Sequence, residues 1–139
     1  MSRAYLDACT IIYLVEGVEA LQRQVKERLE HVRARPDASL VTSRLARLEC
    51  RTGPLREGRT GLLGTYDEFF AAADLCLAEV SAAVIERATD LRARYRLCSP
   101  DAIHLATAIE QRADVFITGD KRLRSVVEVP VELVGEVGR

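Results

Sequence analysis

The chain has 139 residues, of which 48% are hydrophobic and 29% are charged, and its formal net charge is −1. This length predicts a single domain that can bury a core, and the hydrophobic content excludes a disordered chain. The small net charge excludes a global basic field for nucleic acid, so any such binding must use a local patch of basic residues.

The first half of the chain alternates short apolar runs with amphipathic patterns. The amphipathic patterns place apolar residues three and four positions apart, as on one face of a helix. The glycine-rich residues 52–64 interrupt this alternation, and we expect them to form a flexible connection. In chain order, the expected elements are a strand at 3–7, helices at 10–17 and 18–35, a strand at 38–43 and a helix at 44–51.

The second half continues the alternation. Ser81 can cap a long helix, and Ser99 can cap a second one in which Pro100 takes the first helical position. The first of these helices is expected to bury Val84, Ile85, Ala88, Leu91 and Tyr95. The other expected elements are a helix around 65–73, strands at 75–80, 114–118 and 129–134, and a short helix at 121–126.

Alternating strands and helices predict a mostly parallel sheet covered by helices on both faces. We therefore expect one domain over residues 1–139, built as a three-layer α/β/α sandwich. The longest apolar run, residues 8–15, is too short to cross a bilayer and does not follow a basic segment. The four cysteines form no C-x-x-C pair, so zinc or redox chemistry is not indicated. A cytoplasmic protein without a membrane partner is expected.

Three carboxylates occur where predicted strands end or helices begin. Asp7 ends the first strand, Asp101 begins a helix, and Asp120 follows the strand at 114–118 after one glycine. Glu49 lies about one and a half turns into the helix after the second strand. In open α/β sheets the functional groups gather at this edge. The four side chains are therefore expected to lie together.

Four carboxylates held together repel one another, and a hard divalent cation such as Mg²⁺ or Mn²⁺ relieves that repulsion. Such a cation can activate a water molecule and stabilise the charge that develops during phosphodiester hydrolysis. The hydroxyl groups of Thr10 and Thr118 could hold a metal-bound water or a phosphate oxygen. The pattern thus favours a metal-dependent phosphodiesterase.

Over nearly its whole length the chain resembles PIN-domain ribonucleases, and more narrowly the VapC toxins of VapBC toxin–antitoxin pairs. The longest matching stretch is the most specific, because a Pro-Asp helix start, a helix of small residues and a TGD strand end recur together in that family. The stretches that carry the resemblance are YLDACTIIYL, VTSRLARLEC and SPDAIHLATAIEQRADVFITGDKRL.

The resemblance implies a site, a cofactor and partners. Asp7, Glu49, Asp101 and Asp120 match the acidic metal-binding set of the family, with Mg²⁺ or Mn²⁺ as the cofactor. An RNA substrate, a homodimer and a cognate VapB-like antitoxin are also implied. Cys9 stands where the family commonly has serine or threonine.

The remaining polar residues allow less specific interpretations. His104, one turn after Asp101, is interpreted as a packed residue, because carboxylate–metal chemistry does not need it. On their helix, Arg44, Arg47 and Arg51 point away from Glu49 and are interpreted as a solvent or partner face. The expected contacts to RNA phosphates are Arg56, Arg59, Lys121, Arg122 and Arg124.

Two alternatives remain beside a ribonuclease toxin. The first is a non-catalytic module of the same fold that binds RNA or a protein. The second is a phosphotransferase of the haloacid-dehalogenase type, which also begins with an aspartate after its first strand. Its motif requires a second aspartate two residues later, where this chain has Cys9.

Overall fold

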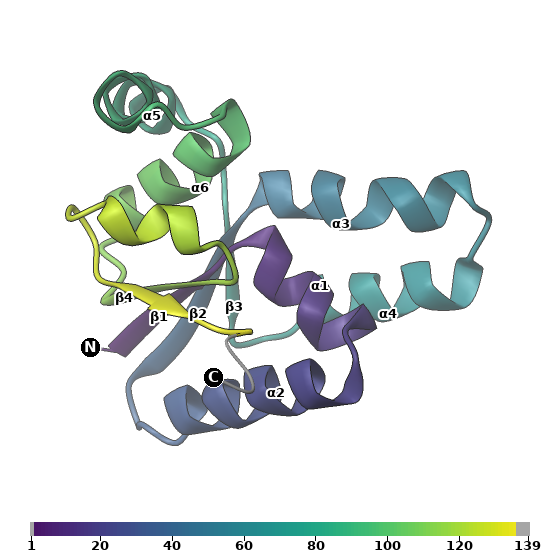
Figure 1. Cartoon of the computed structure of the whole chain (residues 1–139). Coiled ribbons are helices and arrows are strands. Elements are labelled where there is room, and N and C mark those ends of the chain that lie inside the picture. Colours follow the sequence, from purple (N-terminus) through teal and green to yellow (C-terminus); the bar gives the residue numbers. More distant parts are fainter. Residues whose placement is uncertain (1, 136–139) are drawn as a thin grey trace.

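A computed structural model of the chain describes residues 2–135. Its centre is a five-stranded sheet with the order β3-β2-β1-β4-β5, in which every neighbouring pair is parallel (Figure 1). The strands are β1 (Ser2–Leu6), β2 (Ala38–Ser43), β3 (Leu75–Ala78), β4 (Val115–Thr118) and β5 (Val131–Leu133). The helices are α1 (Ala8–Glu16), α2 (Glu19–Arg33), α3 (Arg44–Arg56), α4 (Thr60–Phe70), α5 (Ala82–Tyr95), α6 (Ser99–Glu110) and the short 3₁₀ helix η1 (Lys121–Ser125).

The two faces of the sheet carry separate apolar cores, because successive residues of a strand point to opposite faces. Tyr5, Val41 and Phe116, which are paired across β1, β2 and β4, pack with α5, α6 and η1. Leu6 and Ile117 belong to the other core, with α1, α2, α3 and α4. The predicted three-layer α/β/α sandwich is therefore confirmed.

The carboxyl ends of the strands meet at one edge, because all five strands run in the same direction. Three of these ends lead directly into helix caps. Asp7 follows β1 and caps α1, Ser43 ends β2 and caps α3, and Asp120 follows β4 and caps η1. Side chains of short polar residues that cap helices satisfy the first free backbone N–H groups. The same capping places two of the four predicted carboxylates at this edge.

The prediction of a flexible connection over residues 52–64 was wrong. Helix α3 continues through Pro54 to Arg56, and α4 begins at Thr60, so only three residues join the two helices. Proline costs a helix one hydrogen bond, but Pro54 is buried and α3 packs along α4. Gly58 adopts φ +68°, which glycine tolerates in the turn between them.

Two local expectations also need correction. Ser81 caps α5 as predicted, but Cys98 rather than Ser99 precedes α6, so Ser99 is the first residue of that helix. Ile85 was expected in the core and is 45% exposed. Its place on α5 lies beside Val84, which is the residue that faces the sheet. The cap differs by one residue because the sequence does not locate a helix start that closely. Val84 is buried as expected, and Ile85 is not, because neighbouring residues of a helix point about 100° apart.

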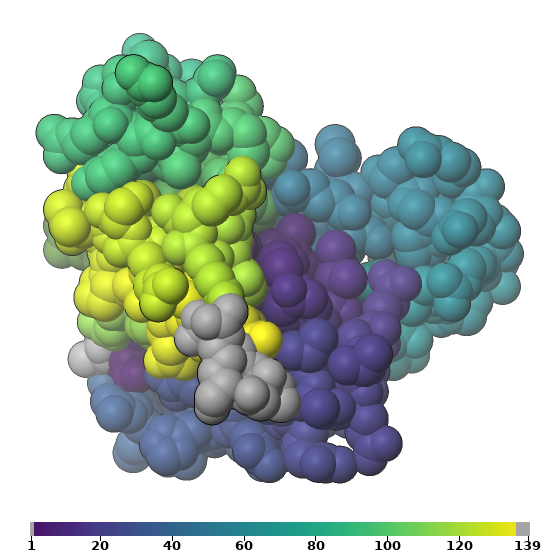
Figure 2. Space-filling model, viewed as in Figure 1, coloured from purple at the N-terminus to yellow at the C-terminus, as the bar shows by residue number. Residues whose placement is uncertain are grey.

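Helices α3 and α4 extend beyond the body of the domain (Figure 1). In the space-filling view of Figure 2, a notch separates this pair from the green and yellow segments that include α5, α6 and η1. Helix α1, in purple, forms the floor of the notch. The carboxyl ends of β1 and β4 lead into α1 and η1, so the predicted site faces this notch.

Glycine at position 17 is required where α1 turns into α2. A Cβ atom at Gly17 would lie 2.4 Å from the backbone oxygen of Tyr13, whereas one at Gly64 in α4 would meet nothing within 4 Å. We expect Gly17→Ala to lower the free energy of unfolding by about 1–3 kcal/mol. Gly64→Ala should raise it by about 0.5–1 kcal/mol, because alanine favours a helix interior over glycine. Urea denaturation of both variants tests this, and an unchanged or stabilised Gly17→Ala variant would contradict it.

Candidate metal centre at the carboxyl edge of the sheet

Asp7 is a buried carboxylate at the end of the central strand, with 6% of its surface exposed. Its Oδ1 accepts a hydrogen bond from the backbone N–H of Thr10 at 2.9 Å, and its Oδ2 accepts one from the Thr118 hydroxyl at 2.5 Å. Within residues 2–135, no lysine or arginine forms an ion pair with it. The structure therefore buries this carboxylate without a cationic side chain.

The surroundings of Asp7 have opposing effects on its ionisation. Burial raises the pKa of Asp7, because the charged form loses its hydration, and the hydrogen bonds from Thr118 and Thr10 partly counteract this. The Thr10 hydroxyl donates to the carbonyl of Ile117 at 2.9 Å, and its side chain lowers the pKa of Asp7 less than its backbone N–H does. Thr10 thus supports Asp7 mainly through its backbone, and Thr118 supports it through its side chain.

Asp120 and Asp101 share a cation, but this cation is an arginine of the same chain. The Arg122 guanidinium contacts Asp120 with Nε at 3.0 Å and Nη2 at 2.5 Å, and its Nη2 lies 3.8 Å from Oδ2 of Asp101. Arg122 lowers the pKa of Asp120 through these hydrogen bonds. The backbone N–H of Asp120 also donates to the hydroxyl of Thr118, which links it to Asp7.

Glu49 contacts a buried histidine. The Nε2 atom of His104 lies 2.5 Å from Oε1 of Glu49, and the Nδ1 atom of His104 lies 2.7 Å from the Tyr5 hydroxyl. Burial raises the pKa of Tyr5 well above its ordinary value, so the phenol stays neutral. His104 is a packed residue, as interpreted from the sequence, with 3% of its surface exposed. Its contact with Glu49 was not anticipated.

Contacts connect three of the four predicted carboxylates. Arg122 connects Asp101 to Asp120, and Thr118 connects Asp120 to Asp7. Glu49 lies near the same strand end, because the charges of both Asp7 and Glu49 raise the pKa of Tyr5 on β1. The region therefore draws its side chains from the ends of β1 and β4 and from α3, α6 and η1.

The possible metal ligands are the carboxylate oxygens of Asp7, Glu49, Asp101 and Asp120. Hard divalent cations prefer such oxygen ligands. As these side chains stand, no group of three or more His, Cys, Asp or Glu residues within 2–135 is close enough to hold an ion. Arg122 contacts both Asp101 and Asp120, and 79% of its side chain is exposed. Arg122 is therefore the group that balances the charge of these two carboxylates in the structure.

Two residues near the site carry contacts that the sequence did not reveal. The Sγ atom of Cys98 donates to Oδ2 of Asp101 at 3.1 Å. Cys9, at the position usual for serine or threonine, interacts with the side chain of Tyr13, and burial raises the pKa of the Cys9 thiol. The hydroxyl contact to Asp7 comes from Thr118 instead. A pattern of local spacing cannot reveal this exchange, because Thr118 is 111 residues away in the chain.

The arginines of α3 lie on the face of the helix that meets acidic neighbours. Arg51 contacts Oδ1 of Asp67 on α4 at 2.8 Å, Arg47 lies 3.7 Å from the same atom, and Arg44 pairs with Glu79. These ion pairs connect α3 to α4 and to the residue after β3. Among the arginines expected to contact RNA, Arg122 is the one that reaches the acidic edge, and it contacts carboxylates there.

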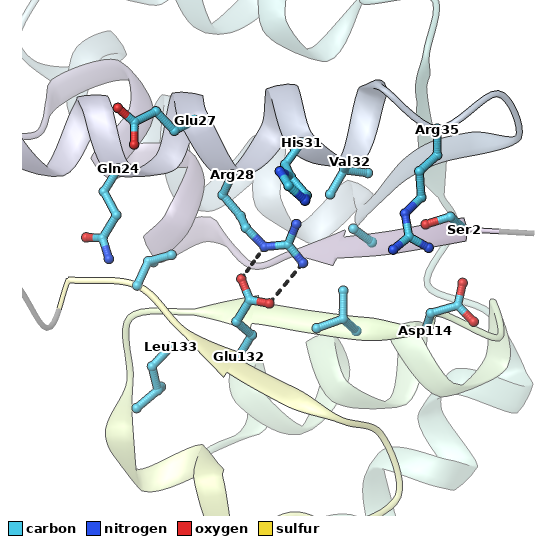
Figure 3. Close-up of a pocket in the computed structure, with 13 residues that line it drawn as sticks. Ser2, Gln24, Glu27, Arg28, His31, Val32, Arg35, Asp114, Glu132 and Leu133 are labelled. Atoms are coloured by element: carbon cyan, nitrogen blue, oxygen red, sulfur yellow. Dashed lines mark hydrogen bonds and ion pairs between the residues drawn. The ribbon is translucent and has the colours of Figure 1, made fainter.

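One cavity lies away from the carboxylates. It has a volume of about 620 Å³ and lies between α2 and the strands β1, β4 and β5 (Figure 3). Across this cavity, Arg28 and Glu132 form a bidentate ion pair, in which Nη2 of Arg28 lies 2.9 Å from Oε1 of Glu132. None of the predicted site residues lines this cavity. The acidic edge, rather than this cavity, is therefore the candidate for chemistry.

We expect Asp7→Asn to raise the midpoint of thermal unfolding at neutral pH, because it removes a buried charge with little change in shape. The raised pKa of Asp7 means that the folded chain binds this proton more tightly than the unfolded chain does. Ionisation of Asp7 therefore costs stability as the pH rises through the window above the ordinary value of 3.8, and costs nothing well below it. The rise in the unfolding midpoint of Asp7→Asn over the parent should therefore shrink as the pH falls through that window.

Calorimetric unfolding at a series of pH values measures this difference. Asp90→Asn, an exposed change on α5, is the matched control and should leave the midpoint unchanged. An Asp7→Asn variant that is less stable than the parent at neutral pH would show that the Asp7 carboxylate stabilises the fold.

Within residues 2–135, no helix is both long and apolar enough to span a membrane. None of the curated proteins matches the sequence at a significant level. Solved structures do match. A chain of the VapBC2 complex from Rickettsia felis, bound to a promoter DNA fragment, gives a TM-score of 0.80 at 14% identity, covering 96% of this chain and 99% of that one.

Two further structures share the fold. A chain of a toxin–antitoxin complex from Klebsiella pneumoniae is 26% identical, with a TM-score of 0.70 and coverage of 91% of this chain and 94% of that one. The sarcin–ricin-loop-cleaving toxin VapC20 from Mycobacterium tuberculosis is 17% identical, with a TM-score of 0.72 and coverage of 91% and 98%. The family model described as the PIN domain matches residues 4–129. Because this match runs from the first strand to the segment before the last one, the chain belongs to the PIN domain family.

Proposed function

We propose that the chain is a metal-dependent endoribonuclease, the toxin of a type II toxin–antitoxin pair, which hydrolyses RNA phosphodiester bonds at the acidic edge. The observation that carries this proposal is the buried Asp7 carboxylate, which has no ion pair within the described residues and is connected through Thr118 to Asp120 and from there through Arg122 to Asp101. A carboxylate buried in this way is costly unless a cation or a proton compensates it. A divalent cation would compensate the charge of Asp7 and could also activate a water molecule for phosphodiester hydrolysis.

The family and the similar structures support the same activity. The chain belongs to the PIN domain family, and the similar structures include VapBC complexes and a toxin that cleaves the sarcin–ricin loop. By this similarity a VapB-like antitoxin is the proposed partner, and RNA is the proposed substrate. We also propose that the chain forms a homodimer.

Each site residue has a role that its position supports. Asp7, Asp101, Asp120 and Glu49 would hold Mg²⁺ or Mn²⁺, which activates a water molecule and stabilises the charge on the phosphate when it is bound. Thr118 keeps Asp7 oriented through its hydroxyl. Once Arg122 has turned away from Asp120, its guanidinium is placed to contact a phosphate of the bound RNA, because planar guanidinium groups pair well with phosphate oxygens.

A second candidate, a module that binds RNA or protein without cleavage, is favoured by one observation. Arg122 already neutralises Asp120, and the acidic residues of the described part are not grouped as a ready ion site. In this case the edge would keep its arginine, and no cation would be needed. The two candidates differ in whether added metal produces cleavage.

We expect the purified chain, freed of antitoxin, to cut labelled total RNA into discrete fragments with Mg²⁺ or Mn²⁺. Asp101→Asn should lower the cleavage rate by at least about 100-fold, because it removes a charge that the cation and the transition state need. Chelator should abolish cleavage. Gel analysis of end-labelled RNA measures both effects and reveals the target.

Asp90→Asn is the matched control, since it makes the same chemical change on an exposed part of α5. It should cleave as the parent does. An Asp101→Asn variant that still cuts at the parental rate would refute the assignment of the site. Folded protein that gives no fragments with either metal would support the binding module instead.

A further inference from the structure

The contact between Glu49 and His104 belongs to a longer chain of hydrogen bonds. Tyr5 on β1 contacts Nδ1 of His104 on α6, and Nε2 of His104 contacts Glu49 on α3. Each of these three elements also carries or precedes a carboxylate of the acidic edge. The histidine therefore connects three parts of the fold that must be in register for the site to form.

The direction of the hydrogen bonds follows from the groups involved. An ionised carboxylate can only accept, so Nε2 of His104 must carry the hydrogen that it donates to Glu49. In a neutral ring Nδ1 is then an acceptor, and the hydroxyl of Tyr5 donates to it. The Tyr5 hydroxyl, the two ring nitrogens of His104 and the Glu49 carboxylate are thus all satisfied as donors or acceptors. Glu49 thus selects the histidine tautomer with hydrogen on Nε2, and the Tyr5 hydroxyl satisfies the remaining ring nitrogen.

Tyr5 and His104, the two buried residues of this hydrogen-bond series, are held in place by their packing. Tyr5 is fully buried and stacks on Phe116 with ring centroids 5.1 Å apart, and it meets the ring of His104 edge-on at 5.8 Å. His104 has 3% of its surface exposed. Glu49 differs, because 26% of its side chain is exposed and it lies at the border between the core and the edge.

A glutamate side chain has several rotatable bonds, and in the free state of the protein it samples many positions unless something holds it. The hydrogen bond from His104 uses Oε1 of Glu49 and leaves Oε2 available to a cation or to water. Hydrogen-bonded partners behind a ligand commonly fix its orientation in this way.

We propose that His104, held by Tyr5, is a positioning residue that fixes the Glu49 carboxylate for binding of a divalent cation at the acidic edge. This inference rests on the proposed function, in which Glu49 is one of the metal ligands. His104 itself contacts neither the cation nor RNA in this arrangement. Its effect reaches the site through Glu49 alone.

The first test is spectroscopic and needs neither metal nor RNA. The chain has two histidines, so His31→Gln leaves the ring signals of His104 alone in long-range ¹⁵N–¹H correlation spectra. We expect a protonated Nε2 and an unprotonated Nδ1. A spectrum with hydrogen on Nδ1 would overturn the proposed chain from Tyr5 through His104 to Glu49.

The second test measures Mn²⁺ binding by isothermal titration calorimetry. His104→Leu, which cannot donate a hydrogen bond, should weaken binding by about 10- to 100-fold, the usual effect of losing a partner behind a ligand. His104→Gln should bind nearly as tightly as the parent, because its amide can donate to Glu49 and accept from Tyr5. His31→Leu makes the same change on α2, away from the acidic edge, and should have no effect.

A double-mutant cycle separates positioning from a general structural role. If His104 acts through Glu49, His104→Leu should weaken Mn²⁺ binding no further in a Glu49→Gln background. An equal further loss there, or parental binding by a folded His104→Leu single variant, would overturn the proposal while the proposed function stands. If the parent chain itself binds no Mn²⁺, the proposed function fails, and the positioning role fails with it.

Discussion

The buried carboxylate of Asp7 is the constraint on which the candidate site depends. It lies at the end of the central strand, and two hydrogen bonds orient it without neutralising its charge. Parallel strands β1 and β4 bring Thr118 beside it, although the two residues are far apart in the chain. The sheet thus fixes one carboxylate of the candidate site, and the helices that follow the strands carry or are capped by the others. Loss of the parallel register would separate Asp7 from Thr118 and dismantle this edge.

Arg122 balances the charge of the outer carboxylates at this edge. In the structure its guanidinium contacts Asp120 and Asp101, so the chain itself supplies their positive partner. The arginine side chain is 79% exposed, and ion pairs of exposed side chains contribute little to stability. We therefore propose that a divalent cation replaces the guanidinium at small cost and leaves the arginine available to a phosphate. Asp7 has no cationic side chain of this kind within the described residues, which is why the proposed metal site is centred on it.

Much of this arrangement could be predicted from the sequence, because strand ends and helix starts have local signals. The apolar strand before Asp120 and the Pro-Asp start of α6 placed two carboxylates at the correct edge. The sequence could not reveal that α3 continues through Pro54, since packing against α4 overrides a local helix breaker. Contacts between distant side chains were also hidden. His104 carries no local sign that it meets Glu49, which is 55 residues earlier in the chain.

The central claim is that the acidic edge binds a divalent cation around Asp7. A crystal soaked in Mn²⁺ and measured for anomalous scattering tests it most directly, because manganese can be located without assumptions about its ligands. We predict an anomalous peak in coordination contact with Asp7 and at least one other carboxylate of the edge, with Arg122 turned away from Asp120. A crystal at saturating Mn²⁺ with no peak there, and with Arg122 still paired to Asp120, would contradict it.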